Sequence, residues 1–217
     1  GLEATGAERV LEALGGRRAV VFTYHRVAEP GAGNPFYDNV VSATPEGFRA
    51  QMTMVRDRFQ VVGPEDLIDD PDDDGRPRAV VTFDDGYRDN FTAALPILRE
   101  LGVPATFFIP TDHVERPRLP WWDHIAYTVK SSNSERFEIE REPGDARPVV
   151  VEPGVGDGDR SAAVMSLIRP VLAGEVSDPD AFLKRLERAA GVDVDSPGLG
   201  RELFMTWEHL RELADAG

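Results

Sequence analysis

The sequence has no cysteine, which excludes disulfides and thiolate metal sites and leaves the cellular compartment open. It also has only two lysines, Lys130 and Lys184, and its 39 acidic against 24 basic residues give a net charge of −15. A chain this acidic is poorly suited to neutralise phosphate groups. We therefore expect no nucleic-acid partner.

Long apolar runs are missing as well. No run approaches the roughly 18 residues of a membrane-spanning helix, so we expect no transmembrane segment. The first ten residues, GLEATGAERV, lack the basic-then-apolar pattern of a signal peptide. The apolar fraction of 41% is still sufficient for a core, and 217 residues fit one domain, or one domain with a sizeable insertion.

Strand and helix patterns alternate in the first half of the chain. Residues 19–24 and 79–83 are β-branched, aromatic or apolar runs that predict strands. Thr44 and Pro45 have the residue types of an N-cap and a first helical position. The helix that they begin carries an apolar stripe at helical spacing: Phe48, Met52, Val55 and Phe59.

The strand at 79–83 begins a βαβ unit. A second apolar stripe, ending at Leu101 before a C-cap glycine at Gly102, predicts a helix from about residue 91. The strand at 105–109 follows it, so the two strands should be parallel neighbours. Pro96 lies inside this helix and should cost one backbone hydrogen bond, with a kink as a consequence.

The pattern weakens between about residues 112 and 204, which we interpret as an insertion or lid. It predicts a helix at 120–129, a polar hairpin between 131 and 154, and two amphipathic helices at 161–172 and 178–191. A last helix at 205–217 should be capped by Thr206. One face of this helix is apolar: Trp207, Leu210 and Leu213.

Two adjacent carboxylates, Asp84 and Asp85, follow the strand at 79–83. Neighbouring side chains in a strand point to opposite faces, but Gly86 allows a sharp turn after which both can reach one cleft. The carboxyl ends of such strands are where α/β folds bind ligands. A metal ion, a shared proton, a helix terminus or solvent could offset the cost of the charge pair, and capping of the next helix is the structural alternative.

TFDDGY at 82–87, with YH at 24–25 and PATFFI at 104–109, resembles the polysaccharide deacetylase family, the NodB-homology carbohydrate esterases. The similarity extends to residues 41–62, 120–127 and 205–217. The resemblance implies an α/β fold, an irregular (β/α) barrel that is incomplete in this chain, with residues 1–217 as the N-terminal part of the domain. It also implies metal-dependent removal of acetyl groups, most often N-acetyl, from a cell-surface polysaccharide, and hence an extracytoplasmic or cell-surface location.

The resemblance also implies residue roles. Asp84 corresponds to the general base, and Asp85 to a ligand of a divalent metal, usually zinc. Members of the family complete the metal site with two histidines spaced H-x-x-x-H after the helix that corresponds to 205–217. The four histidines here do not have this spacing: His25, His113, His124 and His209. We therefore expect the two histidine ligands to be absent, and this chain to be a truncated, inactive portion.

Further candidates for substrate contact are Tyr87, beside the motif, His25, and the possible sugar-stacking pair Trp121 and Trp122. Packing is the alternative for the two tryptophans, and a hydrogen-bonded structural role is the alternative for His25. Two other hypotheses remain open for the whole chain. The first is a non-catalytic carbohydrate-binding relative, and the second is a subunit completed by a partner chain. An unclosed sheet could also self-associate through its open strand edges.

Overall fold

The computed structural model describes residues 19–31, 33–69, 75–154 and 156–215. These residues form two compact units. Unit 1 takes its described residues from Gly1–Ala28, Ser42–Pro110 and Met205–Gly217, and unit 2 from Glu29–Val41 and Thr111–Phe204. The segment 29–41 therefore belongs with the region that the sequence suggested as an insertion, a grouping that the sequence did not predict. The role of this region as an insertion or lid stays a prediction.

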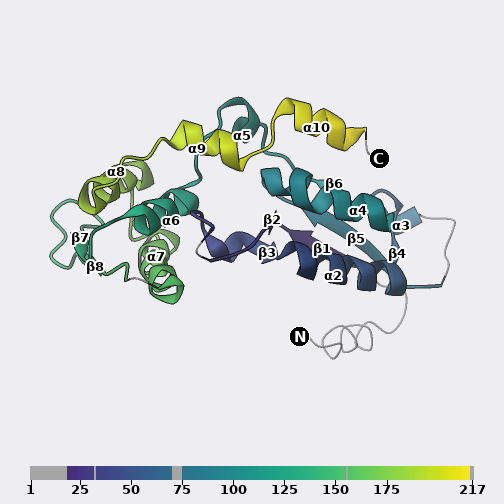
Figure 1. The fold of residues 1–217 in the computed structure, drawn as a ribbon, viewed down its shortest axis with the longest axis horizontal. Coiled ribbons are helices and arrows are strands. Elements are labelled where there is room, and N and C mark those ends of the chain that lie inside the picture. Colours follow the sequence, from purple (N-terminus) through teal and green to yellow (C-terminus); the bar gives the residue numbers. More distant parts are fainter. Residues whose placement is uncertain (1–18, 32, 70–74, 155, 216–217) are drawn as a thin grey trace. The chain divides into compact units, whose positions relative to one another are not determined.

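Unit 1 is built on a four-stranded parallel sheet (Figure 1). Strand β1 (Ala19–Tyr24) pairs with all six residues of β5 (Arg78–Phe83). The short strands β4 (Gln60–Val61) and β6 (Thr106–Phe107) pair with the beginning and the end of β5. Since β1 occupies one whole edge of β5, β4 and β6 share the other edge. The predicted parallel pairing between the strands at 79–83 and 105–109 is confirmed.

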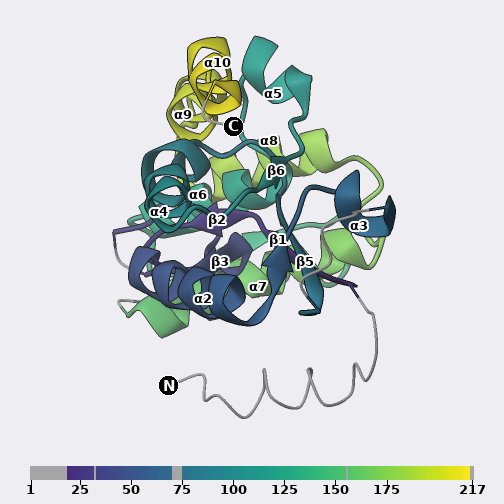
Figure 2. The ribbon, with the colours of Figure 1, turned by 90° about the vertical axis from the view of Figure 1, so that its right-hand side faces the viewer.

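Two helices cover one face of this sheet, as both ribbon views show (Figures 1 and 2). Helix α2 (Pro45–Arg58) begins as predicted, with the Thr44 hydroxyl accepting from Gly47 N at 3.0 Å. Helix α4 (Leu95–Leu101) ends at Gly102 in the left-handed conformation. The core between helices and sheet includes the expected stripe of α2 and the side chains of β5 on that face: Phe48, Met52, Val55, Phe59, Ala79, Val81 and Phe83.

The predicted helix from about residue 91 is not one regular helix. A five-residue π-helix, η2 (Asn90–Ala94), precedes α4. Pro96 has no N–H with which to continue an α-helical ladder, so an irregular turn before it is a reasonable consequence. The expected single helix with a kink is therefore corrected to a π-helix followed by an α-helix.

Smaller elements complete unit 1. Strands β2 (Arg26–Val27) and β3 (Val41–Ala43) pair with each other, and α3 (Asp66–Asp69) is a single turn. Helix α10 (Trp207–Ala214) begins with the predicted Thr206 cap, as part of a capping box with His209. None of its residues is fully buried, and Trp207 is 42% exposed. The residues of the expected apolar face are present, but the described residues do not bury this face in a core.

Unit 2 is mainly helical. It contains the 3₁₀-helix η1 (Asp38–Val40), α5 (Thr111–Glu115), α6 (Trp121–Ser131), the antiparallel pair β7 (Phe137–Ile139) and β8 (Val149–Val151), α7 (Asp157–Leu172), α8 (Pro179–Ala190) and α9 (Ser196–Leu203). The predicted hairpin and the three predicted helices are confirmed, whereas α5 and α9 were not predicted. Asp178 caps α8 by accepting from Ala181 N.

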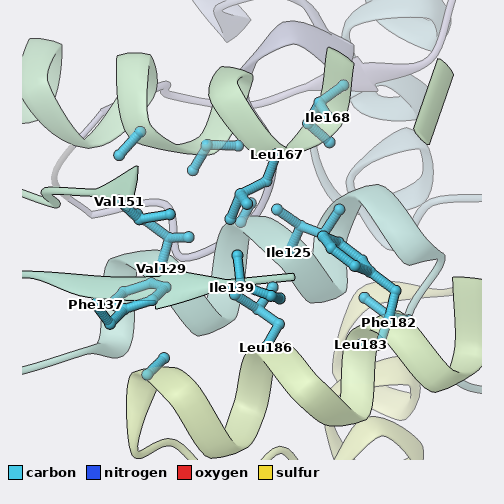
Figure 3. Close-up of a cluster of buried hydrophobic side chains, with 14 of the residues drawn as sticks. Ile125, Val129, Phe137, Ile139, Val151, Leu167, Ile168, Phe182, Leu183 and Leu186 are labelled. Atoms are coloured by element: carbon cyan, nitrogen blue, oxygen red, sulfur yellow. The ribbon is translucent and has the colours of Figure 1, made fainter. Parts of the chain in front are cut away.

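The core of unit 2 lies between its three long helices and its hairpin. Figure 3 shows side chains of α6, α7 and α8 pointing toward one another and toward those of β7 and β8. The labelled members are Ile125, Val129, Phe137, Ile139, Val151, Leu167, Ile168, Phe182, Leu183 and Leu186. Unit 2 therefore has an apolar core of its own.

The expected barrel is only partly supported. The architecture is mixed α/β, and the strands of the described residues form no closed barrel. In the same part of the chain, no helix combines the length and the apolar character that crossing a membrane requires.

Candidate functional site

Asp84 and Asp85 lie where β5 ends and the chain turns. Asp84 N donates to Tyr24 O at 2.9 Å, which continues the pairing with β1 one residue beyond β5. Asp85 then has φ +68°, and it is the one non-glycine with positive φ among the described residues. Aspartate tolerates this left-handed conformation better than most residues, but the conformation still costs about 1–2 kcal/mol. The unusual backbone therefore coincides with the carboxylate pair, as strain at functional sites often does.

Gly86 continues the turn with φ +69°. A Cβ at this position would lie 3.3 Å from Ile109 Cγ2, and the Gly86 carbonyl accepts from Met205 N at 3.0 Å. The sequence predicted that Gly86 allows a sharp turn here. The structure adds that Asp85 shares the left-handed backbone.

The side chains of Asp84 and His25 have no hydrogen-bond or ion-pair partner among the residues that the structure describes. Both residues are half-buried. Asp84 therefore does not cap the helix that follows in this part of the chain. The main chain of His25 is nevertheless fixed, because its N–H donates to Ser42 Oγ at 2.9 Å and its carbonyl accepts from Asn90 Nδ2 at 2.7 Å.

A buried ion pair lies next to the segment that carries Asp84 and Asp85. Arg26 Nε lies 2.8 Å from Asp89 Oδ2, and the two side chains are 8% and 15% exposed. Asp89 Oδ1 also accepts from Val27 N at 3.0 Å. Burial raises the pKa of Asp89 above its ordinary value, against the opposing effect of the Arg26 charge and the two hydrogen bonds. This group connects β2 to the start of η2, and so fixes the segment after β1 against the segment after the motif.

Sequence reasoning missed this support, although both partners adjoin the quoted motifs: Arg26 follows YH, and Asp89 lies four residues after Asp85. The sequence did not reveal that the segment after β1 and the segment after β5 lie side by side. Parallel pairing of β1 with β5 in register brings their carboxyl ends together, with Tyr24 opposite Phe83.

Two tyrosines near the motif have buried side chains. The side chain of Tyr87 is fully buried, with the Arg26 guanidinium 5.4 Å from the centre of its ring. The Tyr24 hydroxyl donates to Gln51 Oε1 at 2.8 Å, and burial raises the pKa of Tyr24 to about 12. Both side chains are buried, and the substrate contact predicted for Tyr87 stays a prediction.

The other candidates lie in unit 2. Trp121 and Trp122 are half-buried at the start of α6, with ring centroids 5.5 Å apart and planes at 82°. His124, one turn later, lies with its Nε2 2.6 Å from Glu187 Oε1. His113 stacks on Phe204 with ring centroids 4.2 Å apart. The sequence-predicted residues thus divide into Asp84, Asp85, Tyr87 and His25 in unit 1 and the two tryptophans in unit 2.

The described residues do not fit a complete metal site. No group of three or more His, Asp or Glu side chains that could bind an ion together occurs among them. His209, the remaining histidine, accepts from Thr206 N through Nδ1 at 3.2 Å and stacks on Phe91. Zinc sites normally use three or four protein ligands, so Asp85 with the neighbouring carboxylate is an insufficient donor set.

Comparison with known proteins identifies the motif segment. Residues 72–144 match the family model described as polysaccharide deacetylase, which confirms the resemblance over this segment. No curated protein matches the chain.

Several solved structures are similar to the chain. They include a polysaccharide deacetylase from Bacillus cereus (25% identity, 46% of this chain and 31% of that chain, TM-score 0.35). IcaB from Ammonifex degensii has 19% identity over 93% of this chain and 82% of that chain, with a TM-score of 0.39. A de-N-acetylase from Aggregatibacter actinomycetemcomitans has 18% identity over 80% and 76%, also with a TM-score of 0.39. The match therefore spans about a third of the first of these chains and most of the other two.

Proposed function

We propose, from the polysaccharide deacetylase segment at residues 72–144, that this chain belongs to a hydrolase that removes acetyl groups, most often N-acetyl, from a polysaccharide. The observation that carries the proposal is the position of Asp84 and Asp85. Both follow the carboxyl end of the central strand β5, on a backbone turn that only glycine and a few other residues adopt readily. Both also lie inside the segment that matches the family.

In this proposal Asp84 is the general base. Its carboxylate has no partner among the described residues, and it is therefore available to take a proton from the attacking water. Attack by that water on the acetyl carbonyl forms a tetrahedral intermediate. As the intermediate collapses, the proton held by Asp84 passes to the leaving nitrogen, the C–N bond breaks, and acetate and a free amine are released.

The remaining roles follow from position. We propose Asp85 as a metal ligand, because family members generally depend on a metal. The described residues do not complete a metal site, so no step is assigned to an ion, and we expect little activity from these 217 residues alone. His25, with a fixed main chain and an uncommitted ring, is proposed as a substrate contact. For Tyr87 we propose a substrate contact that positions the acetyl group through the backbone N–H or the side chain.

The direct test measures acetate release by the complete product of the gene that encodes these residues. N-acetylated oligosaccharides are the substrates, and the variants are Asp84→Asn and Asp85→Asn. Removing a general base should lower kcat about 10²–10⁴-fold. Glu202→Gln, which changes an exposed carboxylate in unit 2, is the matched control and should leave the rate unchanged.

Each result selects one of the hypotheses. A rate that survives Asp84→Asn contradicts the assigned base. Glycan binding without any acetate release favours the non-catalytic relative. Activity that appears only with a second polypeptide favours the partner-completed subunit. The free edge of β1 in the described sheet leaves self-association as a further proposal, which light scattering over a range of protein concentrations tests.

A further inference from the structure

A pocket in unit 2 combines aromatic and polar side chains from separate parts of the chain. It has a volume of about 560 Å³ and is lined by residues of α6, α8 and the segment before α6, with one residue each from α5 and α9. Trp121, Trp122 and His124 come from α6, and Lys184 and Glu187 from α8. This volume lies within the range of small-molecule sites, roughly 300–1,000 Å³.

The aromatic pair provides two perpendicular apolar surfaces. The rings of Trp121 and Trp122 are at 82° to each other, so one ring can face a flat ligand while the other borders its edge. The C–H groups of a pyranose ring carry partial positive charge and pack favourably on the negative face of an indole. Both tryptophans also pack against the core of unit 2, which fixes their orientation.

A carboxylate lies beside this aromatic pair. Glu187 Oε1 is 2.6 Å from His124 Nε2, and Glu187 makes no other hydrogen bond among the described residues. Its second oxygen can therefore accept a hydrogen bond from a ligand hydroxyl or amide N–H. The His124 contact holds the carboxylate in place, which reduces the entropy that is lost on binding.

The charges of the lining favour a neutral ligand. Lys184 and Arg118 are balanced by Asp180 and Glu187, so the pocket has no dominant sign. The whole chain is strongly acidic, which disfavours polyanionic ligands over longer distances. An uncharged ligand with one apolar face and several hydroxyl or amide groups fits this lining best.

We propose that this pocket is a glycan-binding subsite in unit 2 that takes one neutral N-acetylhexosamine unit. The proposal rests on the proposed function only for the acetyl group of the ligand. The saccharide character follows from the tryptophan pair, the carboxylate and the balanced charge. The proposal assigns binding to this pocket and no catalytic step.

Tryptophan fluorescence can report ligand binding in this pocket alone. The chain has three tryptophans, and Trp207 in unit 1 is the one that does not line the pocket. In a Trp207→Phe protein all tryptophan emission therefore comes from Trp121 and Trp122. Titration with N,N′,N″-triacetylchitotriose should change this emission saturably, with Kd on the order of 1 mM.

Variants of the lining decide whether the pocket is responsible. Glu187→Gln keeps the shape of the side chain, and Trp121→Leu keeps an apolar group against the core, so both should fold. Each should weaken binding by about tenfold, a change that corresponds to removal of one good contact. Glu202→Gln, an exposed acid outside the pocket lining, should bind as the parent protein does. Circular dichroism establishes that each variant is folded.

Three outcomes overturn the proposal. They are the absence of a saturable change, equal binding by the Glu187→Gln and Trp121→Leu variants, and equal binding of maltotriose, which has no acetyl group. Failure of the proposed function is separate from these. If the protein binds the trisaccharide but releases no acetate, the subsite proposal stands and the hydrolase proposal fails. If acetate is released without a fluorescence response, the hydrolase proposal stands and the subsite proposal fails.

Discussion

Replacement of Lys130 by methionine should destabilise unit 2 strongly. Lys130 Nζ donates to Asn34 O at 2.9 Å, to Phe36 O at 2.6 Å and to Asp38 Oδ2 at 2.8 Å. The ammonium thus uses all three of its donors to fix residues 34–38 to the end of α6. The side chains of Lys130 and Asp38 are 11% and 19% exposed, so solvent replaces these interactions poorly.

The expected loss is about 3–5 kcal/mol. Hydrogen bonds to a charged group contribute about 1.5–3 kcal/mol each, but bonds that share one ammonium do not add. Removing one partner of a buried ion pair typically costs about 3–5 kcal/mol, because the other partner remains buried without compensation. Lys130→Met keeps the length and apolar stem of the side chain, so the loss reports the charged head rather than a cavity.

Urea denaturation is the assay, followed by Trp121 and Trp122 fluorescence in the Trp207→Phe background. Lys184→Met is the matched control, because it removes the other lysine of the chain, which is exposed, and should change stability by less than about 0.5 kcal/mol. Equal midpoints and slopes for Lys130→Met and Lys184→Met would refute the reasoning.

The difference between wild type and Lys130→Met should depend on pH. Burial alone would raise the pKa of Asp38, but the hydrogen bonds from Lys130, Gly31 and Asn34 and the Lys130 charge outweigh it and lower that pKa. The folded state therefore binds this proton less tightly than the unfolded state, whose pKa is about 3.9. The contribution is present above the unfolded pKa and is lost as pH falls through the folded pKa. The difference in unfolding free energy between wild type and Lys130→Met should therefore become smaller in acid. It should not vanish, since the carbonyls of Asn34 and Phe36 lack their donor in the variant at every pH.

Two further predictions concern the candidate site. Asp85→Ala should be less stable than Asp85→Gly by about 1 kcal/mol, since only glycine adopts φ +68° without steric cost. Equal midpoints of the two variants in urea denaturation would argue against strain at Asp85. Asp89→Ala removes the carboxylate that lies 2.8 Å from Arg26 Nε, and breaking this buried ion pair should cost about 3–5 kcal/mol in urea denaturation. The double variant with Arg26→Met should recover part of that loss, and a purely additive result would show that the pair is not coupled.

The local elements of this fold could be read from the sequence, because their signals are local. Thr44 before Pro45, Gly102 after an apolar stripe and Thr206 before the last helix each act within a few residues, and the structure uses each as predicted. The motif at Asp84 and Asp85 was recognisable for the same reason, since residue type and position after a strand are both local.

Elements without a strong periodic pattern were not predicted. The short helices α5 and α9 were missed, and the helix after the motif was expected to be regular rather than a π-helix followed by α4. The apolar face of α10 followed from spacing, but spacing alone cannot say whether a face is covered. Burial is a property of the packed chain.

The sequence by itself determined the alternation of strands and helices, the caps that bound them, and the family segment with its two adjacent carboxylates. Only the tertiary structure decided which distant residues meet. It paired Arg26 with Asp89, joined residues 29–41 to 111–204 in one unit, and placed Glu187 beside the tryptophans of α6. The physical reason is range: propensity and capping act over a few residues, whereas ion pairs and pockets depend on packing between segments that are far apart in the chain.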